Sequence, residues 1–341
     1  MAISVLKPAT PHAMEANEKP HKAAYPEPLD AIVLAGTDSN PRRMIQGQNK
    51  AFLEIGGRPL VREVVEALLA AESVGDVFVV GPRERLDAAL GDFSEQVTRV
   101  QQRGKMLANA WAAIDASEAR EQERTGTTDP HRPLLVISSD IPLITPAAVD
   151  DFVARCAAED AGFDGGYAML CGVADESSLK KYYPADGKPG IVRPYVNFRN
   201  SRQRLANIYV GRPRLLTNQA LLQTGFDHRK MVKLKNVLAI AWTFLRQAGS
   251  WQAAWLSLRM QLTLMASRRG GRLYRWLREG NSARHTERVC SRVLGGPIRI
   301  VVTPYGGLSL DADNEDDFRV LAARYDDWIG MPPADGVPEL T

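Results

Sequence analysis

Two kinds of segment alternate through the first half of the chain, and this alternation restricts the fold more than any other feature. Short apolar runs typical of buried strands are followed by runs with apolar residues at helical spacing. The strand-like runs are residues 31–35, 76–81 and 133–139, and the helix-like runs are residues 59–71, 83–90 and 106–116. Strands joined by such helices form right-handed crossovers, so we predict an α/β fold with a doubly wound, mostly parallel sheet covered on both faces. Ligands of such sheets bind at the carboxyl ends of the strands.

The ends of the chain and its cysteines narrow the class of protein. Residues 1–28 contain five prolines and no long apolar block, so we expect a disordered leader, and we interpret the tail at 331–341 in the same way. The 341 residues are 45% hydrophobic, which suffices for one large domain and a second lobe. The three cysteines lack CxxC spacing, which fits buried thiols in a cytoplasmic protein better than a zinc site or disulfides.

Charge is distributed very unevenly along the chain. Residues 193–299 contain 21 Lys and Arg but only three acids, whereas the rest of the chain has 22 bases and 37 acids. A basic block of this kind usually meets an anion, which can be a phosphate, a nucleic acid or a membrane surface.

The loop after the first strand carries residues suited to a polyphosphate. Gly36 follows the strand directly, and without a Cβ it lets backbone amides approach an anion. Arg42, Arg43 and Lys50 add charge-assisted donors in the same loop. Neither GxxxxGK[ST] nor GxGxxG is present there, which argues against a P-loop NTPase and a dinucleotide dehydrogenase. A solvated surface loop is the alternative interpretation.

Three motifs in this order resemble the MobA-like nucleotidyltransferases of the GT-A type. They are "LAG", "RRM" and "NKAFLEIGGRPLV" within residues 30–61, "SSDIPLIT" at 138–145 and "GGLSLDADNEDDFRVL" at 306–321. The resemblance implies a GT-A or Rossmann-like domain that transfers NMP from an NTP to a phosphorylated acceptor, releases pyrophosphate and uses Mg²⁺. It also implies roles for individual residues. The NTP lies against Leu34, Ala35, Gly36 and Thr37, the catalytic residues are Arg43 and Lys50, and the metal ligand is Asp140.

The "DAD" segment offers a second metal ligand. Mg²⁺ prefers one or two carboxylates plus phosphate oxygens and water, so Asp311 or Asp313 could complete the site with Asp140, and we favour Asp311. Alternation along an extended segment would place Asp311 and Asp313 on the same side. The alternative is an acidic helix start with Asp313 or Asn314 as the cap, and we accept it for the three acids at 315–317.

Two further segments are assigned by position in the family pattern. Residues 101–111 lie where the family has a glycine loop that contacts base and ribose, although a plain loop that opens a helix is the alternative. The candidates there are Gly104, Lys105 and Asn109. Residues 192–213 resemble the acceptor-side region of relatives, although arginines on a solvated face would look the same. The candidates there are Arg193, Arg199, Arg202, Arg204 and Asn207.

Residues 231–294 are not required by the family pattern, and we predict a basic, amphipathic helical insertion. The longest uncharged run, residues 247–258, is too short for the roughly 20 residues of a membrane span. A helical hairpin broken near Gly249 and Ser250, with tryptophans beside arginines, would suit an interfacial helix or a lid over a lipidic acceptor. Residues 237–278 are then the candidate contact with an anionic membrane. A subdomain packed on the sheet or forming a homodimer is the alternative, and no nucleic acid is expected.

These observations predict a Mg²⁺-dependent nucleotidyltransferase. The domains are a core at 29–230, the insertion at 231–294 and a core completion at 295–330 that carries the second metal motif. CTP or GTP is the favoured NTP, and the acceptor is a sugar, alcohol or lipid phosphate. The location is the cytoplasm, with a peripheral membrane position as an open alternative. Molybdenum cofactor guanylyltransferase is the second candidate, and a non-catalytic membrane- or RNA-binding protein with the same fold is the third.

Overall fold

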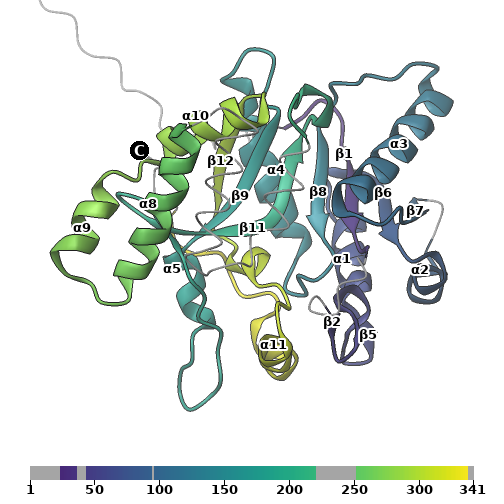
Figure 1. Cartoon of the computed structure of the whole chain (residues 1–341). Helices are drawn as coiled ribbons and strands as arrows, with labels where there is room; N and C mark the ends of the chain where they lie inside the picture. The colour runs from purple at the N-terminus through teal and green to yellow at the C-terminus, as the bar shows by residue number, and fades with distance from the viewer. Residues whose placement is uncertain (1–23, 37–43, 94–95, 220–250, 337–341) are drawn as a thin grey trace, which may run out of the picture.

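The computed structural model describes residues 24–36, 44–93, 96–219 and 251–336, which form a central sheet with helices on both faces (Figure 1). The seven strands of its main path are hydrogen-bonded in the order β12-β9-β11-β8-β1-β6-β7, and the short β10 (Val196–Asn197) pairs with β11. In this order the strands are β12 (Ile298–Thr303), β9 (Met169–Asp175), β11 (Arg202–Gly211), β8 (Leu134–Ser138), β1 (Leu29–Leu34), β6 (Val74–Gly81) and β7 (Val97–Gln101).

The predicted α/β fold with a mostly parallel sheet is confirmed, with one long exception. β1 is parallel to both β6 and β8, β6 is parallel to β7, and β12 is parallel to β9. β11 runs antiparallel to both β8 and β9. The carboxyl ends of β1 and β8 therefore lie at one edge of the sheet, and the loops that follow them meet there.

Helices cover both faces because successive residues of a strand point to opposite sides. Val33 of β1 packs in a cluster with Val64 of α1 and Val149 of α4, whereas its neighbour Ile32 packs with Ala113 of α3 on the other face. The helices on the faces of the sheet include α1 (Leu60–Leu69), α2 (Arg83–Leu90), α3 (Met106–Thr125) and α4 (Pro146–Ala161). The last helix, α11 (Glu315–Trp328), packs in a separate cluster with Leu60 and Tyr182.

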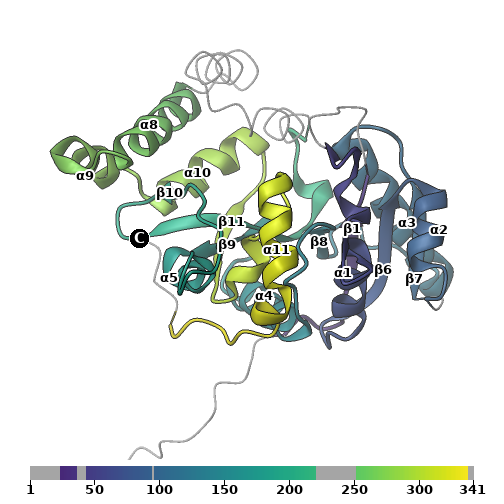
Figure 2. The ribbon, with the colours of Figure 1, turned by 90° about the horizontal axis from the view of Figure 1, so that it is seen from below.

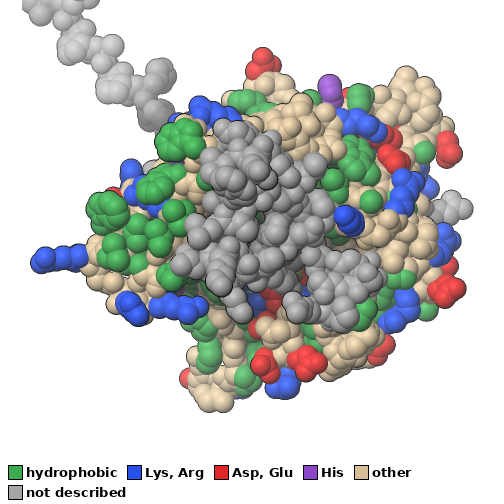
Figure 3. Space-filling model, in the orientation of Figure 1, with side chains coloured by type: hydrophobic (Ala, Val, Ile, Leu, Met, Phe, Trp, Pro, Cys, Tyr) green, Lys and Arg blue, Asp and Glu red, His purple; other side chains and the backbone are tan. Residues whose placement is uncertain are grey.

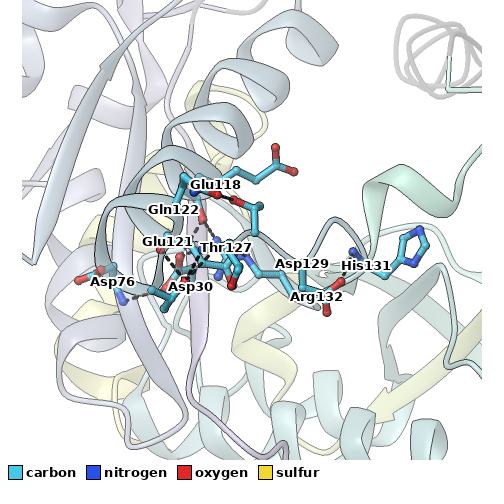
Figure 4. A network of polar contacts seen from close by, with 12 residues as sticks. Asp30, Asp76, Glu118, Glu121, Gln122, Thr127, Asp129, His131 and Arg132 are labelled. Carbon is cyan, nitrogen blue, oxygen red and sulfur yellow. Dashed lines mark hydrogen bonds and ion pairs between the residues drawn. The ribbon is translucent and has the colours of Figure 1, made fainter.

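The amino-terminal end of β1 is tied to the last turns of α3 by a polar network (Figure 4). Asp30 accepts hydrogen bonds from Ser117 Oγ at 2.7 Å and from Arg132 at 2.9 Å, and Arg132 also pairs with Glu121 at 3.1 Å. These contacts fix α3 along the sheet and lie at the end of β1 away from its carboxyl-terminal loop.

Short elements complete the fold. Two small hairpins, β2–β3 and β4–β5, occupy the connection between β1 and α1. The short elements are β2 (Met44–Ile45), β3 (Gln48–Asn49), η2 (Lys50–Phe52), β4 (Glu54–Ile55), β5 (Arg58–Pro59), α5 (Glu176–Leu179), η3 (Lys180–Tyr182), η4 (Pro213–Leu215) and η5 (Gly306–Ser309).

In the described part of the chain between β11 and β12, three helices extend to one side of the sheet (Figures 1 and 2). They are α8 (Trp251–Ser267), α9 (Gly271–Glu279) and α10 (Ala283–Leu294). α10 packs against β12, and α8 packs on α10 through Leu256 and Val289. Among the described residues, no helix has the length and apolar character needed to cross a membrane. The predicted break at Gly249 and Ser250 lies outside the described residues, and the domain boundaries remain predictions.

Candidate active site

Lys50 is placed by the asparagine that precedes it. Asn49 caps η2 by accepting the Ala51 amide at 3.1 Å, and its own amide donates to the carbonyl of Ala35 at the end of β1, at 2.7 Å. The hairpin that carries Lys50 is thereby fixed to the carboxyl end of β1. The Lys50 side chain is only 12% exposed, and its ammonium lies 3.5 Å from Asp140 Oδ2 and 3.4 Å from Asp313 Oδ1.

Asp140 lies in the loop after β8, beside the end of β1. Ser138 Oγ donates to its carboxylate, and Ser139 Oγ donates to the carbonyl of Leu34 at 2.9 Å. The backbone carbonyl of Asp140 accepts the Ala312 amide at 3.1 Å, which joins this loop to the "DAD" segment. The sequence motifs at 138–145 and 306–321 are therefore neighbours in space.

Two arginines bind the "DAD" segment. Arg204 of β11 lies 3.3 Å from Asp311 Oδ1 and 3.9 Å from Asp313 Oδ2, so both carboxylates face one guanidinium, as alternation along an extended segment predicts. Arg193 lies 2.5 Å from Asp313 and 2.6 Å from Asp317 at the start of α11. Asn314 caps that helix by accepting the Asp317 amide at 2.9 Å.

Six charged side chains meet at this point and are called the charged cluster below. They are Lys50, Asp140, Asp311, Asp313, Arg193 and Arg204. Two of them have shifted pKa values. Burial raises the pKa of Asp311 to about 6; the negative charges of Asp140 and Asp313 add to this, and Arg204 opposes it. Burial also lowers the pKa of Arg204 below its ordinary value. The described residues contain no group of three or more His, Cys, Asp or Glu arranged to hold a metal ion. Mg²⁺, however, commonly takes only one or two protein carboxylates and completes its coordination with phosphate and water.

Of the predicted base-side residues, Asn109 lies against Gly36, just after the end of β1. Asn109 is buried in the first turn of α3, where its Oδ1 accepts the Arg103 amide at 2.6 Å and its Nδ2 donates to the Gly104 carbonyl at 3.2 Å. A Cβ added to Gly36 would lie 2.2 Å from Asn109 Nδ2, so the two loops touch where Gly36 has no side chain. Leu34 and Ala35 lead into this contact, Lys105 is exposed at the start of α3, and Thr37 and Arg43 lie outside the described residues.

The five predicted acceptor residues do not lie together. Arg193 and Arg204 belong to the charged cluster. Arg202 instead pairs with Glu176 at 2.6 Å and lies over the Tyr195 ring, and Arg199 donates to the carbonyl of Glu279 at 2.7 Å, at the end of α9. Asn207 is half-buried in the middle of β11.

Two residues of this region escaped the sequence analysis. Asn49 was not singled out, although an asparagine before a short helical turn is a typical cap. Asp317 was predicted only to suit the helix dipole, and its ion pair with Arg193 joins segments far apart in the sequence.

Comparisons with known proteins agree with the motifs. Residues 31–197 match the model of the MobA-like NTP transferase domain. Two curated relatives, both named bifunctional protein GlmU, are 35% identical (Sorangium cellulosum, 43% of this chain and 30% of the relative) and 28% identical (Sinorhizobium fredii, 51% and 36%). This chain therefore spans about a third of the length of those relatives.

A solved structure shows the same fold over most of the chain. It is a hypothetical transferase from Thermus thermophilus, 22% identical, with a TM-score of 0.53 over 85% of this chain and 99% of that one. Residues 31–197, just under half of the chain, thus resemble the MobA-like NTP transferase domain, a domain of nucleotidyltransferases.

Proposed function

We propose that this protein transfers NMP from an NTP to a phosphorylated acceptor and releases pyrophosphate. The observation that carries the proposal is the position of Lys50, whose ammonium is held between Asp140 and Asp313 at the carboxyl end of β1. An ammonium at the carboxyl end of a parallel strand, where ligands of such sheets bind, can donate charge-assisted hydrogen bonds to a phosphate.

The chemistry follows from the charges of the substrates. A phosphate oxygen of the acceptor attacks the α-phosphorus, a new P–O bond forms, and the bond between the α-phosphorus and the bridging oxygen breaks as pyrophosphate leaves. The attacking phosphate is already ionised near neutral pH, so no strong general base is required. The protein has to align two anions and compensate the negative charge on the transferring group, which is the role of Lys50 and, by resemblance, of Arg43.

The charged cluster also fits Mg²⁺. Asp140 and Asp311, with Asp313 beside them, would hold the ion, and Mg²⁺ would supply further neutralisation of the phosphate oxygens. The raised pKa of buried Asp311 has neighbouring carboxylates among its causes, and a divalent cation between them would relieve that repulsion. Arg193 and Arg204 already neutralise part of this charge, which keeps the loops together without a cation.

We assign the two substrates to different parts of the site. The loop at 34–37, together with Gly104, Lys105 and Asn109, is the proposed NTP side, with CTP or GTP favoured. Arg193 and Arg204 are the proposed anchors of the acceptor phosphate, since guanidinium groups bind phosphate through paired hydrogen bonds. Arg199, Arg202 and Asn207 are proposed to contact the rest of the acceptor, which is a sugar, alcohol or lipid phosphate.

Thermal unfolding with each of the four NTPs, with Mg²⁺ and with EDTA, tests the nucleotide half of this proposal. A ligand at 100 times its Kd stabilises the folded state by about 2.7 kcal/mol, so one NTP should raise the Tm clearly, and only with Mg²⁺. A Tm that no NTP changes would contradict the proposal. Stabilisation by GTP and transfer to molybdopterin alone would instead support a molybdenum cofactor guanylyltransferase, and stabilisation without turnover would support a non-catalytic binding protein.

A further inference from the structure

Helix α8 presents an apolar stripe to solvent. Its four exposed apolar side chains are Trp251, Trp255, Leu262 and Met265, with exposed fractions of 65%, 51%, 36% and 54%. At 3.6 residues per turn, their spacing of four, seven and three residues confines them to an arc of about 80°. The buried Ala253, Leu256 and Thr263 lie on the opposite side of the helix, and a fourth buried residue, Ala254, borders the stripe. α8 therefore packs on the protein with one face and leaves a second apolar face uncovered.

Helix α9 extends this apolar surface. Leu273 and Trp276 are 62% and 67% exposed and lie one turn apart. In Figure 3, hydrophobic side chains gather on the side of the molecule that carries α8 and α9. Single exposed apolar residues are ordinary, but a patch of six that includes three tryptophans indicates an interaction surface.

Four arginines border the patch, and all of them are exposed. They are Arg268, Arg269, Arg272 and Arg275, at the end of α8 and along α9. None of these four forms an ion pair with another residue in the part of the chain that the structure describes. By contrast, Arg259 and Arg278 nearby donate to the carbonyls of Leu277 and Phe198 and hold the helices together. Residues 251–279 contain a single acid, Glu279.

We propose that the exposed face of α8 and α9 docks on the surface of an anionic lipid bilayer. Tryptophans and aliphatic side chains beside arginines are typical of helices that lie in the membrane interface, where indole rings sit at the level of the headgroups and arginines meet anionic lipids. A second copy of this chain is a poorer occupant, because a symmetric dimer through this face would bring two sets of exposed arginines together.

Hydrogen bonds link the proposed docking face, the exposed side of α8 and α9, to the segment that carries Arg193 of the charged cluster. Tyr274 of α9 donates its hydroxyl to Asn197 Oδ1 at 2.9 Å, and Asn281 donates to the Asn197 carbonyl at 3.0 Å. Asn197 ends the segment that begins at Arg193 in the cluster. A bilayer bound to α8 and α9 would therefore lie at a fixed orientation to the proposed acceptor side. The docking itself does not depend on the proposed reaction, so its test needs no substrate.

Vesicle sedimentation tests the proposal with the full-length protein. Vesicles of phosphatidylcholine alone are compared with vesicles that also contain phosphatidylglycerol, over a series of salt concentrations. We expect binding to the anionic vesicles that weakens as salt rises, because exposed arginines are screened within a Debye length of about 8 Å at physiological ionic strength. Brominated lipids should quench tryptophan fluorescence on binding, since three indole rings would enter the interface.

Matched variants separate the two parts of the surface. Trp251→Ser with Trp255→Ser should weaken binding at every salt concentration, roughly tenfold or more, and should remove most of the quenching by brominated lipids. The double replacement Arg272→Gln and Arg275→Gln should weaken binding to anionic vesicles by roughly 30-fold at low salt. It should also make the salt dependence about half as steep, because Arg268 and Arg269 remain. Arg319→Gln on α11, whose side chain is 74% exposed, is the matched control and should bind like the unaltered protein. All variants should keep the Tm, because the replaced side chains are exposed.

Three results would overturn the proposal. One is a folded protein that does not sediment with anionic vesicles at low salt. Another is binding that the tryptophan and arginine variants leave unchanged. The third is a dimer, detected by sedimentation velocity, that the tryptophan variant converts to a monomer, since a second copy would then be the occupant of the surface.

Discussion

The ammonium of Lys50 lies 3.5 Å from Asp140 Oδ2, although the two residues belong to separate loops at the ends of β1 and β8. Parallel pairing of these neighbouring strands brings the loops together, and the Asn49 side chain fixes the Lys50 hairpin to the end of β1. In the proposed reaction Lys50 compensates charge on the transferring group, and Asp140 is placed to hold both the lysine and a cation. Each role can be tested separately.

Replacement of Lys50 should affect turnover more than binding. Lys50→Ala removes a positive charge proposed to act on the transferring phosphoryl group, so we expect kcat to fall by about 100-fold or more and KM for the acceptor to change little. The measurement is steady-state pyrophosphate release at varied acceptor concentration. Arg85→Ala, an exposed cation that contacts Gln48 of the same hairpin, is the control and should keep kcat. An unchanged kcat in Lys50→Ala would remove Lys50 from the reaction.

Replacement of Asp140 should abolish the response to Mg²⁺. Asp140→Asn keeps the shape of the side chain and an acceptor for Ser138, so the Tm should stay near that of the unaltered protein. The loss of one carboxylate should remove Mg²⁺-dependent stabilisation by NTP and most of the transfer activity. Asp316→Asn, with a side chain that is 86% exposed, is the matched control. Activity of Asp140→Asn within a few-fold of the unaltered protein would show that Asp140 is not a metal ligand.

Gly36 should not tolerate a side chain. In Gly36→Ala the new Cβ would lie 2.2 Å from Asn109 Nδ2, so the amide or the loop has to move, and we expect a loss of about 1–3 kcal/mol of stability together with weaker NTP binding. Gly162→Ala is the control, because its Cβ would have its nearest contact at 3.6 Å. Adding Asn109→Ala to Gly36→Ala should restore part of the loss. Equal Tm values for the two glycine variants would contradict this contact.

The pH dependence of stability should reveal Glu287, which is buried on α10 against β12. Burial raises its pKa from 4.5 to about 7, although the Ile300 amide donates to the carboxylate at 3.0 Å and opposes the shift. The charged side chains around it are Arg284, Arg288, Arg299 and Glu159. The folded protein thus binds a proton that the unfolded chain releases between these two pH values. The contribution of Glu287 to the free energy of unfolding is therefore full below about pH 4.5 and is lost as the pH rises through about 7.

Glu287→Gln tests this linkage because glutamine can still accept the Ile300 amide but does not titrate. The Tm of the variant should fall less than that of the unaltered protein between about pH 5 and pH 8. Glu279→Gln, with a side chain that is 73% exposed, is the control and should follow the unaltered protein. Parallel Tm curves for Glu287→Gln and the unaltered protein would contradict the assignment.

Local patterns were sufficient to predict much of the fold. Alternating apolar runs predicted the parallel strands, and α2 has the predicted bounds of residues 83–90. α3 continues to Thr125, beyond the predicted end at residue 116. Its last turns are held by polar contacts such as that of Ser117 with Asp30. Polar residues show no apolar periodicity, so the sequence pattern did not predict this part of the helix. The antiparallel direction of β11 was not predictable either, since periodicity carries no strand direction.

The site shows the same division between local and long-range information. Alternation correctly predicted that Asp311 and Asp313 face one side, where Arg204 contacts both. The bond between Arg193 and Asp317 could not be predicted, because it depends on how two distant segments pack. The separation of Arg199 and Arg202 from the charged cluster has the same origin, since each is held by a partner, at Glu279 and Glu176 respectively, that the sequence pattern does not specify.

Pyrophosphate release tests the central claim most directly. The unaltered protein and Lys50→Ala are each incubated with the four NTPs and a panel of sugar, alcohol and lipid phosphates, with Mg²⁺ or with EDTA. We predict that the unaltered protein releases pyrophosphate with one NTP and one class of acceptor, only with Mg²⁺, and that Lys50→Ala is at least about 100-fold slower. Release that is equal in the two proteins, or no release by the unaltered protein with any NTP and acceptor despite NTP binding, would contradict the claim.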